Sequence, residues 1–312
     1  MRRLHKIFTL AIIAMLSIVC ISPAAARSKK MKALIISGQN NHNWEVSHRV
    51  LRLILSQSEL FEVDTLLTPA KGGDMSKFYP EFEDYDVVVL DYNGDRWSKA
   101  TDEAFIQYVK RGGGVVVYHA ADNAFAEWDE FNKVIALGGW EGRNEKSGPY
   151  YYLINGIGVL DNGPGVGGSH GAQRDYPMHC RNAKHPITKG LPDNWMHARD
   201  EMYDRMRGPA NIKDLLYSGY ADPKTGGSGR EEPLIFTVDY GKARIFHIML
   251  GHAGPTLEDN PAMQCAGFQT LILRGAEWAA TGKVKQRVPL DFPSDQRPSL
   301  RPKYRATFNP VK

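Results

Sequence analysis

Short apolar runs alternate with segments of helical periodicity through the first half of the chain. The apolar runs are rich in β-branched residues, which is typical of strands buried between two helix layers. A regular alternation of strands and helices with short connections predicts a doubly wound α/β fold, with a mostly parallel sheet covered on both faces. Strands are predicted at 32–37, 61–67, 86–90 and 115–118, and helices at 46–56, 99–110 and 128–136.

The second half opens with a glycine-rich insertion, from Leu137 to Arg174. In it, neither the apolar runs of the strands nor the helical periodicity continues. A long irregular insertion in a compact domain is commonly functional, and the aromatic residues and the histidine in this one favour that interpretation. The Pro-rich, charged tail at 283–312 is expected to wrap the surface or to be partly disordered. Between them, strands are predicted at 176–181, 214–220, 234–239 and 243–249, and a helix at 265–280.

Residues 1–26 have the pattern of a secretory signal peptide. Three basic residues precede an apolar stretch at 7–22, and Ala24-Ala25-Ala26 offers a small-residue cleavage site. The stretch is short for a membrane span, so cleavage is favoured over anchoring and no membrane contact is expected afterwards. We therefore expect an exported protein, periplasmic or extracellular, whose mature chain starts near Arg27 and whose single domain covers 27–282.

The net charge indicates which kind of molecule the protein binds, and the cysteine content raises the question of a disulfide. The net charge of +4 falls to +1 when the three basic residues of the signal peptide are removed, so nothing indicates a nucleic-acid partner. The expected partner is a small molecule, and a homo-oligomer is possible. Cys180 and Cys265 remain after cleavage, and the sequence leaves open whether they pair.

Four histidines are the main candidates for chemistry. His119 directly follows the predicted strand 115–118, and ligands bind at the carboxyl ends of strands in open α/β sheets. His42, His170 and His252 lie in loops rich in glycine or asparagine. If these loops converge, several imidazoles share one cleft, where they can perform acid–base work. Alternatively, His42, His119 and His252 hold a divalent metal such as zinc.

An acidic segment supplies a fifth candidate. Glu201 follows Asp200, and adjacent carboxylates can orient a histidine, ligate a metal or act as a general base. The alternative is a solvated stretch paired with neighbouring arginines. A covalent nucleophile is disfavoured, because no cysteine follows the strand 115–118. Ser169, in Gly167-Gly168-Ser169-His170-Gly171, is only a weak candidate, since it lies beside His170 in a glycine-rich loop.

Taken in order, several motifs resemble the ThuA-like, or trehalose-utilisation, family over 32–282. The resemblance implies a flavodoxin-like fold of the class I glutamine-amidotransferase type and a role in using disaccharides or their keto derivatives. Many members carry a histidine soon after a Gly-Gly pair, whereas this chain has Trp140 there, and His170 is a candidate replacement. The matching motifs are Tyr85 to Leu90, Gly112 to His119, Leu137 to Trp140, His185 to Leu191, Asp200 to Tyr203, and Tyr240 to His252.

These observations favour a sugar hydrolase or isomerase without a covalent nucleophile. Two alternatives stay open: a non-catalytic periplasmic carbohydrate-binding protein, and a protein in which zinc is structural. Trp44, Trp97 or Tyr150 could stack on the apolar face of a sugar. The candidate catalytic residues are His119, His252, Glu201 and His170, and the candidate substrate-binding residues are His42, Asn41, Trp44, Asn123, Asp200 and Tyr150.

Overall fold

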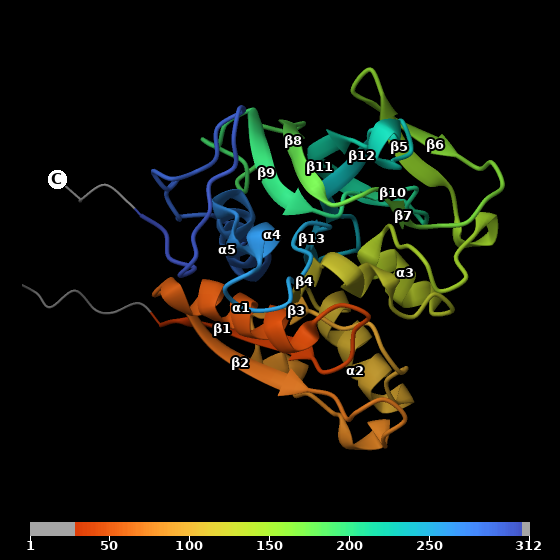
Figure 1. Ribbon diagram of the computed structural model, residues 1–312. Helices are drawn as coiled ribbons and strands as arrows, with labels where there is room; N and C mark the ends of the chain where they lie inside the picture. Colours follow the sequence, from red (N-terminus) through yellow and green to blue (C-terminus); the bar gives the residue numbers. More distant parts are fainter. Residues whose placement is uncertain (1–28, 308–312) are drawn as a thin grey trace, which may run out of the picture.

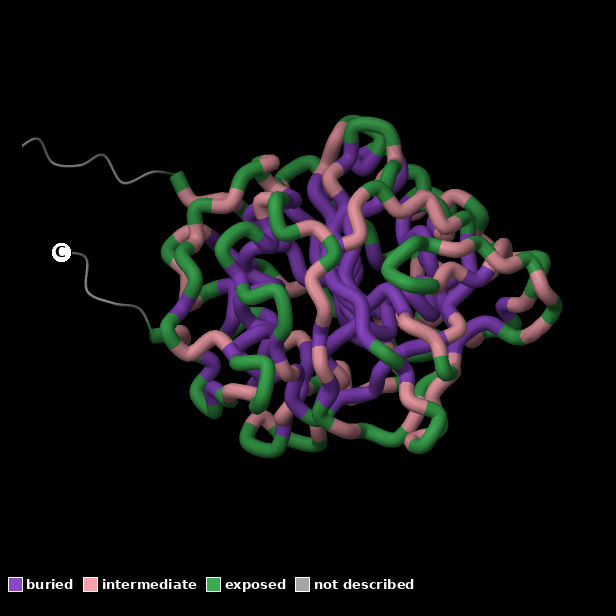
Figure 2. The backbone as a smooth tube through the Cα atoms, turned by 90° about the horizontal axis from the view of Figure 1, so that it is seen from above, coloured by how far each residue is buried: buried purple, intermediate pink, exposed green. Residues whose placement is uncertain are grey.

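One mixed β-sheet runs through residues 29–307, the part of the chain described by the structure, which is a computed structural model (Figure 1). The strands follow the order β2-β1-β3-β4-β13-β12-β11-β8-β9. Figure 2 shows the buried strands at the centre of the molecule, with exposed loops around them. The predicted signal peptide and its cleavage site lie outside the described residues.

The first five strands in this order are parallel to their neighbours, so their carboxyl ends share one edge. Four of these strands are largely buried on both faces, as expected for apolar runs between two helix layers, whereas the edge strand β2 exposes Glu62, Asp64 and Leu66. The flavodoxin-like α/β fold class is therefore confirmed. The strands are β1 (Met31–Ser37), β2 (Phe61–Leu67), β3 (Val87–Leu90), β4 (Gly114–Tyr118) and β13 (Arg244–Ile248).

Helices cover the two faces of this parallel half. Right-handed crossovers place α1, between β1 and β2, and α2, between β3 and β4, on opposite faces. The last helix, α5, packs against α1 and β4, and α3 meets α2 where the rings of Phe105 and Phe131 lie 6.4 Å apart. The helices are α1 (Trp44–Gln57), α2 (Lys99–Lys110), α3 (Asp129–Ile135), α4 (Pro261–Gln264) and α5 (Ala266–Thr281).

An antiparallel half extends the sheet beyond β13. Its last strand, β9, coincides with the acidic segment, for which no strand was predicted. The strands are β12 (Glu231–Val238), β11 (Ile212–Tyr220), β8 (Arg174–Cys180) and β9 (Asn194–Asp200). Short 3₁₀ helices lie at Met75–Lys77, Phe82–Asp84, His119–Asn123, Glu145–Ser147 and Pro223–Thr225.

The glycine-rich insertion is more regular than its composition suggests. It contains an antiparallel hairpin of β5 (Tyr150–Ile154) and β6 (Ile157–Asp161). The turn residues Asn155 and Gly156 have φ values of 52° and 77°, which is the left-handed conformation that a tight hairpin turn requires. At the end of the insertion, β7 (Ser169–His170) pairs with β10 (Tyr203–Asp204) and brings His170 beside the segment that follows β9.

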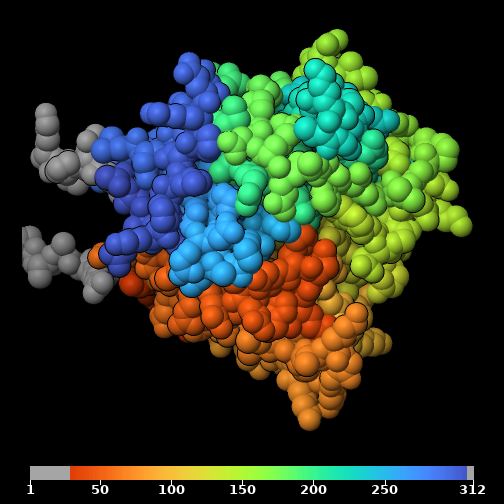
Figure 3. Space-filling model, in the orientation of Figure 1, coloured from red at the N-terminus to blue at the C-terminus, as the bar shows by residue number. Residues whose placement is uncertain are grey.

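The described part of the tail, 283–307, runs along the surface and is hydrogen-bonded to the start of α5. The backbone N–H of Ala266 donates to Ser299, and that of Arg301 donates to Gln264, each at 2.8 Å. The Tyr304 hydroxyl donates to the Leu257 carbonyl at 2.7 Å. Figure 3 shows the tail, in dark blue, against the lighter blue segment that begins near residue 250.

Two further expectations can be compared with the structure. Cys180 and Cys265 are both free thiols, and Cys265 is buried at the start of α5. Across residues 29–307, no helix combines the length and the apolar character needed to cross a membrane.

A buried carboxyl group lies at the end of β3 and makes stability depend on pH. Asp91 is 1% exposed and accepts hydrogen bonds from the hydroxyls of Ser37 and Ser47 at 2.9 and 2.7 Å. Burial raises its pKa from 3.8 to about 7, in spite of these hydrogen bonds. The folded state therefore holds a proton that the unfolded state has already released between these pH values. The free energy of unfolding should accordingly fall as pH rises through this window.

We expect Asp91→Asn to remove this contribution, which amounts to at most roughly 1.4 kcal/mol per pH unit between about pH 4 and 7. Urea unfolding of both proteins at pH 5, 6, 7 and 8 measures it. The unfolding free energy of Asp91→Asn minus that of wild type should increase as pH rises. The exposed Asp175 provides the control, because Asp175→Asn should leave the slope unchanged. Parallel curves for wild type and Asp91→Asn would contradict the prediction.

Candidate functional site

His119 occupies the turn at which β4 ends and a short 3₁₀ helix begins. Its φ of 44° is a left-handed conformation that is uncommon for a residue other than glycine, and such strain is often found at functional sites. The ring is fixed from one side, because Nδ1 lies 2.7 Å from the carbonyl oxygen of Met249. A carbonyl oxygen can only accept, so Nδ1 carries the proton and Nε2 presents a lone pair.

His42 and His252 reach the same place from the loops after β1 and β13. The His42 ring centroid lies 4.7 Å from that of His119 and 4.6 Å from that of His252. Because β1, β4 and β13 are parallel, their carboxyl ends bring all three imidazoles to one edge of the sheet. The convergence of three of the four histidine loops is thus a direct result of the topology.

Glu201 completes this group from the antiparallel half, directly after β9. We call His42, His119, His252 and Glu201 the histidine–carboxylate cluster, in which one ligand atom per residue lies within 4.8 Å of all the others. Glu201 Oε2 and His252 Nδ1 are both buried and lie 3.2 Å apart, and within the described residues each has only the other as a polar partner. Buried polar atoms usually have their hydrogen-bonding capacity satisfied, so a cation bound beside both atoms fits this arrangement.

The electrostatics of His42, His119 and Glu201 suit metal binding at neutral pH. Burial, then the neighbouring imidazoles, lower the pKa of His42 to about 3, and burial also lowers that of His119. Burial opposes ionisation of Glu201, but the nearby histidines lower its pKa to about 2. His252 differs: burial lowers its pKa, but the Glu201 carboxylate outweighs this and the net pKa is raised. Neutral imidazoles and an ionised carboxylate are the forms that ligate metals.

Asp200 lies beneath the cluster and is fully buried. Its carboxylate accepts hydrogen bonds from the backbone N–H groups of Glu201 at 2.8 Å, Gly251 at 2.6 Å and His252 at 3.0 Å. His197 Nε2 lies 2.7 Å away on the other side and is equally buried. The structure therefore places Asp200, a predicted substrate-binding residue, where it holds the backbone of two cluster members.

Two polar side chains lie over the outer oxygen of Glu201. His170 Nε2 is 3.9 Å from Glu201 Oε1, and Gln173 Nε2 donates to the same oxygen at 3.4 Å. The His170 side chain is 38% exposed, and its Nδ1 lies 2.8 Å from the carbonyl of Gly171. His170 therefore stands between solvent and the cluster, outside the set of four ligand-type residues.

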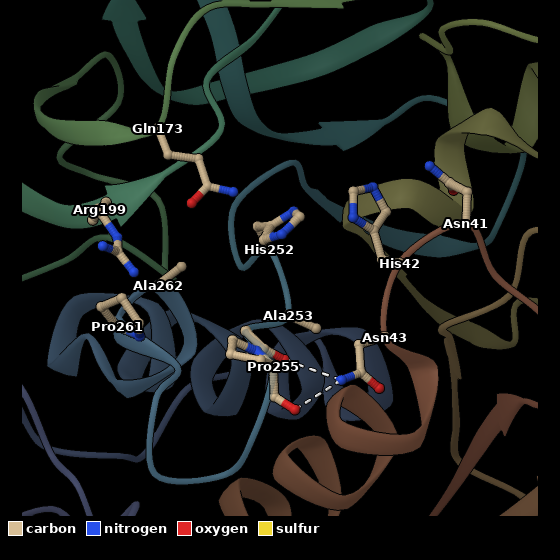
Figure 4. A pocket seen from close by; sticks show the side chains of 11 residues that line it. Asn41, His42, Asn43, Gln173, Arg199, His252, Ala253, Pro255, Pro261 and Ala262 are labelled. Atoms are coloured by element: carbon tan, nitrogen blue, oxygen red, sulfur yellow. Dashed lines mark hydrogen bonds between the residues drawn. The ribbon is translucent and has the colours of Figure 1, made fainter.

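A cavity of about 360 Å³ opens beside His42 and His252 (Figure 4). Gln173 and Arg199 lie on one side of it and Asn41 on the other, and Asn43 donates to the carbonyls of the opposite loop. The remaining lining residues are Ala253, Gly254, Pro255, Pro261 and Ala262. Among the described residues that line this cavity, His42 and His252 carry the only aromatic rings, and the amide and guanidinium groups offer hydrogen bonds to a ligand.

A family model described as trehalose utilisation, ThuA, matches residues 32–279. The chain belongs to the ThuA family. A ThuA-like protein of Parabacteroides merdae is 61% identical, and the match covers 90% of this chain and 100% of that one with a TM-score of 0.88. A ThuA-like protein of Bacteroides uniformis is 21% identical, over 85% of this chain and 97% of that one, and its TM-score of 0.53 shows the shared fold alone. None of the curated proteins matches the chain.

Membership of the ThuA family confirms the resemblance inferred from the motifs and indicates a carbohydrate-related function. In the structure, His170 also lies near Trp140, the residue that follows the Gly-Gly pair. Trp140 follows that pair, and its ring lies 6.1 Å from the His170 ring and 4.8 Å from the Tyr203 ring. The insertion thus brings His170 to the vicinity of Trp140.

Other predicted residues of this ThuA chain lie outside the cavity lining. Trp97 is 4% exposed and packs among core phenylalanines, which excludes it as a sugar platform. Trp44 begins α1 and stacks on His48, and Tyr150 lies against Arg207. Asn123 is buried, and its Oδ1 has no hydrogen-bond partner within the described residues.

Sequence reasoning missed Tyr203, whose hydroxyl lies within 3.1 Å of two cluster histidines. Its presence in the matching motif from Asp200 to Tyr203 was the available signal.

Proposed function

We propose that this protein is a sugar hydrolase or isomerase that acts on a disaccharide or a keto-sugar derivative with the help of a divalent metal. The observation that carries the proposal is the histidine–carboxylate cluster, in which four ligand-type side chains lie within 4.8 Å of one another beside a polar cavity. Membership of a trehalose-utilisation family supports a sugar as the substrate.

The residues of the cluster fit zinc better than calcium or magnesium. Three imidazoles and one carboxylate are ligands typical of zinc, whereas calcium and magnesium prefer all-oxygen sites. Glu201 Oε2 and His252 Nδ1, which within the described residues have only each other as a partner, would both gain the metal as a further partner. When bound, such a metal would supply Lewis-acid polarisation of a substrate oxygen.

The protein's own residues would bind the substrate and move protons. Asn41, Gln173 and Arg199 line the cavity and offer amide and guanidinium groups to sugar hydroxyls. His170 is partly exposed and can exchange a proton with water, and its Nε2 faces the cluster. We assign His170 the proton-transfer step for this reason, because a general acid or base must reach both the substrate and a proton source.

The proposal includes export. It is supported by the basic residues, the apolar stretch and the small residues at 1–26. The mass of the mature N-terminus, measured on protein recovered from the periplasm or the medium, tests it. An uncleaved chain that stays inside the cell would contradict export and leave the proposed chemistry untouched.

Metal content and turnover, measured together, test the proposed function. The protein is purified without a metal-affinity tag, analysed by elemental mass spectrometry and assayed on disaccharides and their keto derivatives before and after chelation. We expect near-stoichiometric metal and a turnover that chelation abolishes and zinc restores. Sugar binding without turnover would instead favour a carbohydrate-binding protein. Unfolding on chelation, with unchanged sugar binding by the folded fraction, would favour a structural metal.

A further inference from the structure

Tyr203 touches the cluster at its centre. The hydroxyl oxygen lies 3.1 Å from Nε2 of His42 and 3.1 Å from Nε2 of His119. The phenol ring stacks on the His119 imidazole, with centroids 4.5 Å apart and planes inclined by 24°, and the Trp140 ring packs edge-on at 4.8 Å. At 1% exposure, the side chain is held in place from several sides.

The hydrogen bonds of this hydroxyl depend on what the imidazoles bind. Since the Met249 carbonyl fixes the proton of His119 on Nδ1, the Nε2 atom of His119 is an acceptor, and Tyr203 donates to it. If a metal takes the Nε2 lone pairs of His119 and His42, the hydroxyl loses both nitrogens as acceptors. Its proton must then find an oxygen nearby, because an unsatisfied buried donor is costly.

The hydroxyl of Tyr203 belongs to a phenol, a group that ordinarily keeps its proton at neutral pH. A phenol that stays neutral at working pH can donate a hydrogen bond without giving up its proton. That is the requirement for a group that stabilises negative charge developing on an oxygen.

We infer that Tyr203 is a catalytic residue whose hydroxyl donates a hydrogen bond to the substrate oxygen held at the histidine–carboxylate cluster. The inference rests on the proposed function and adds a residue to it. The hydroxyl keeps its proton throughout, so no bond forms or breaks at Tyr203. Its action is to lower the energy of the state in which that oxygen carries the most negative charge.

Tyr203→Phe removes the hydroxyl and keeps the ring that stacks on His119. Tyr176→Phe is the matched control, because Tyr176 is also fully buried and its hydroxyl has no partner within the described residues. Cobalt is loaded into all three proteins, since its absorption spectrum reports both its own binding and the binding of acetate, a probe with a negatively charged oxygen. Turnover is measured on the zinc-loaded proteins.

We expect Tyr203→Phe to bind cobalt within about threefold of wild type, but acetate about tenfold more weakly, which corresponds to one lost hydrogen bond to a charged group. We also expect kcat to fall roughly 10²- to 10³-fold with little change in KM, as when one donor is removed from an oxyanion site. Tyr176→Phe should match wild type in all three measurements.

Acetate affinity and kcat at wild-type values in Tyr203→Phe would overturn the inference. Loss of cobalt from this variant would also overturn it, because Tyr203 would then only position the metal ligands. A wild-type protein that binds no cobalt would instead refute the proposed function, and the role of Tyr203 with it. The measurements on wild type test the proposed function, and those on Tyr203→Phe test the role of Tyr203, so the failure of one can be told from the failure of the other.

Discussion

His119→Ala is expected to lose bound metal and measurable turnover together. His119 contributes one of four ligands, and structural zinc sites bind with roughly 10–16 kcal/mol, so one ligand accounts for about 3–4 kcal/mol. Metal affinity should accordingly fall by about two to three orders of magnitude. Elemental mass spectrometry after dialysis measures the content, and competition with a chromophoric chelator measures the affinity.

Two control variants distinguish the loss of a metal ligand from a simple loss of folding. His119 has a φ of 44°, a conformation that asparagine tolerates better than alanine, so His119→Asn should keep the turn and still lose the metal. His48→Ala removes an imidazole from α1, outside the cluster, and should keep full metal content. Stoichiometric metal in a folded His119→Asn protein would be incompatible with the assigned ligand set.

Asp200→Asn is expected to have the second-largest effect, on stability and on metal affinity at once. The carboxylate accepts from the backbone of Glu201, Gly251 and His252 and contacts His197, with every distance at or below 3.0 Å. An asparagine turns one acceptor oxygen into a donor that faces other donors. Breaking a buried charged network of this kind costs about 3–5 kcal/mol of unfolding free energy.

The same substitution should loosen the metal although Asp200 is not one of the four cluster residues. Partners that orient the ligands of a metal typically contribute 10- to 100-fold in affinity. Urea unfolding and chelator competition measure the two effects separately. Asp102→Asn is the comparison, because Asp102 pairs with Arg96 at 2.7 Å on α2, a helix that carries no cluster residue, and should leave metal affinity unchanged. Unchanged metal affinity in a folded Asp200→Asn protein would argue against a positioning role.

The parallel half of the fold was predictable because its signals are local. The helical spacing at 99–110 coincides with α2, and the apolar run before His119 coincides with β4 to within one residue. The β5–β6 hairpin was missed although Asn155-Gly156 is among the strongest hairpin signals, because the density of glycines around it indicated an irregular loop. The sequence therefore contained the signal for this hairpin, but the surrounding glycines led to its being interpreted as a loop.

The site was predictable only in part, since its last members come together through long-range packing. The parallel topology alone predicts that the loops carrying His42, His119 and His252 meet at one edge. Tyr203 contacts His42 across 161 residues of sequence, and it lies in a two-residue strand, too short to carry an apolar period. Likewise, nothing local distinguishes Asp200, whose carboxylate accepts from backbone N–H groups, from Glu201, which joins the cluster.

The hydrogen bonds of the tail have a consequence for the order in which the protein is built. Synthesis proceeds from the N-terminus, so His42, His119 and Glu201 leave the ribosome long before Ser299 and Tyr304. These late residues hold Ala266 and Leu257, which flank the cavity-lining residues Pro261 and Ala262. The nascent chain therefore presents these ligand-type side chains before the residues that brace this wall of the cavity exist. The hydrogen bonds from Ser299 and Tyr304 can form only when nearly all of the described residues have been made.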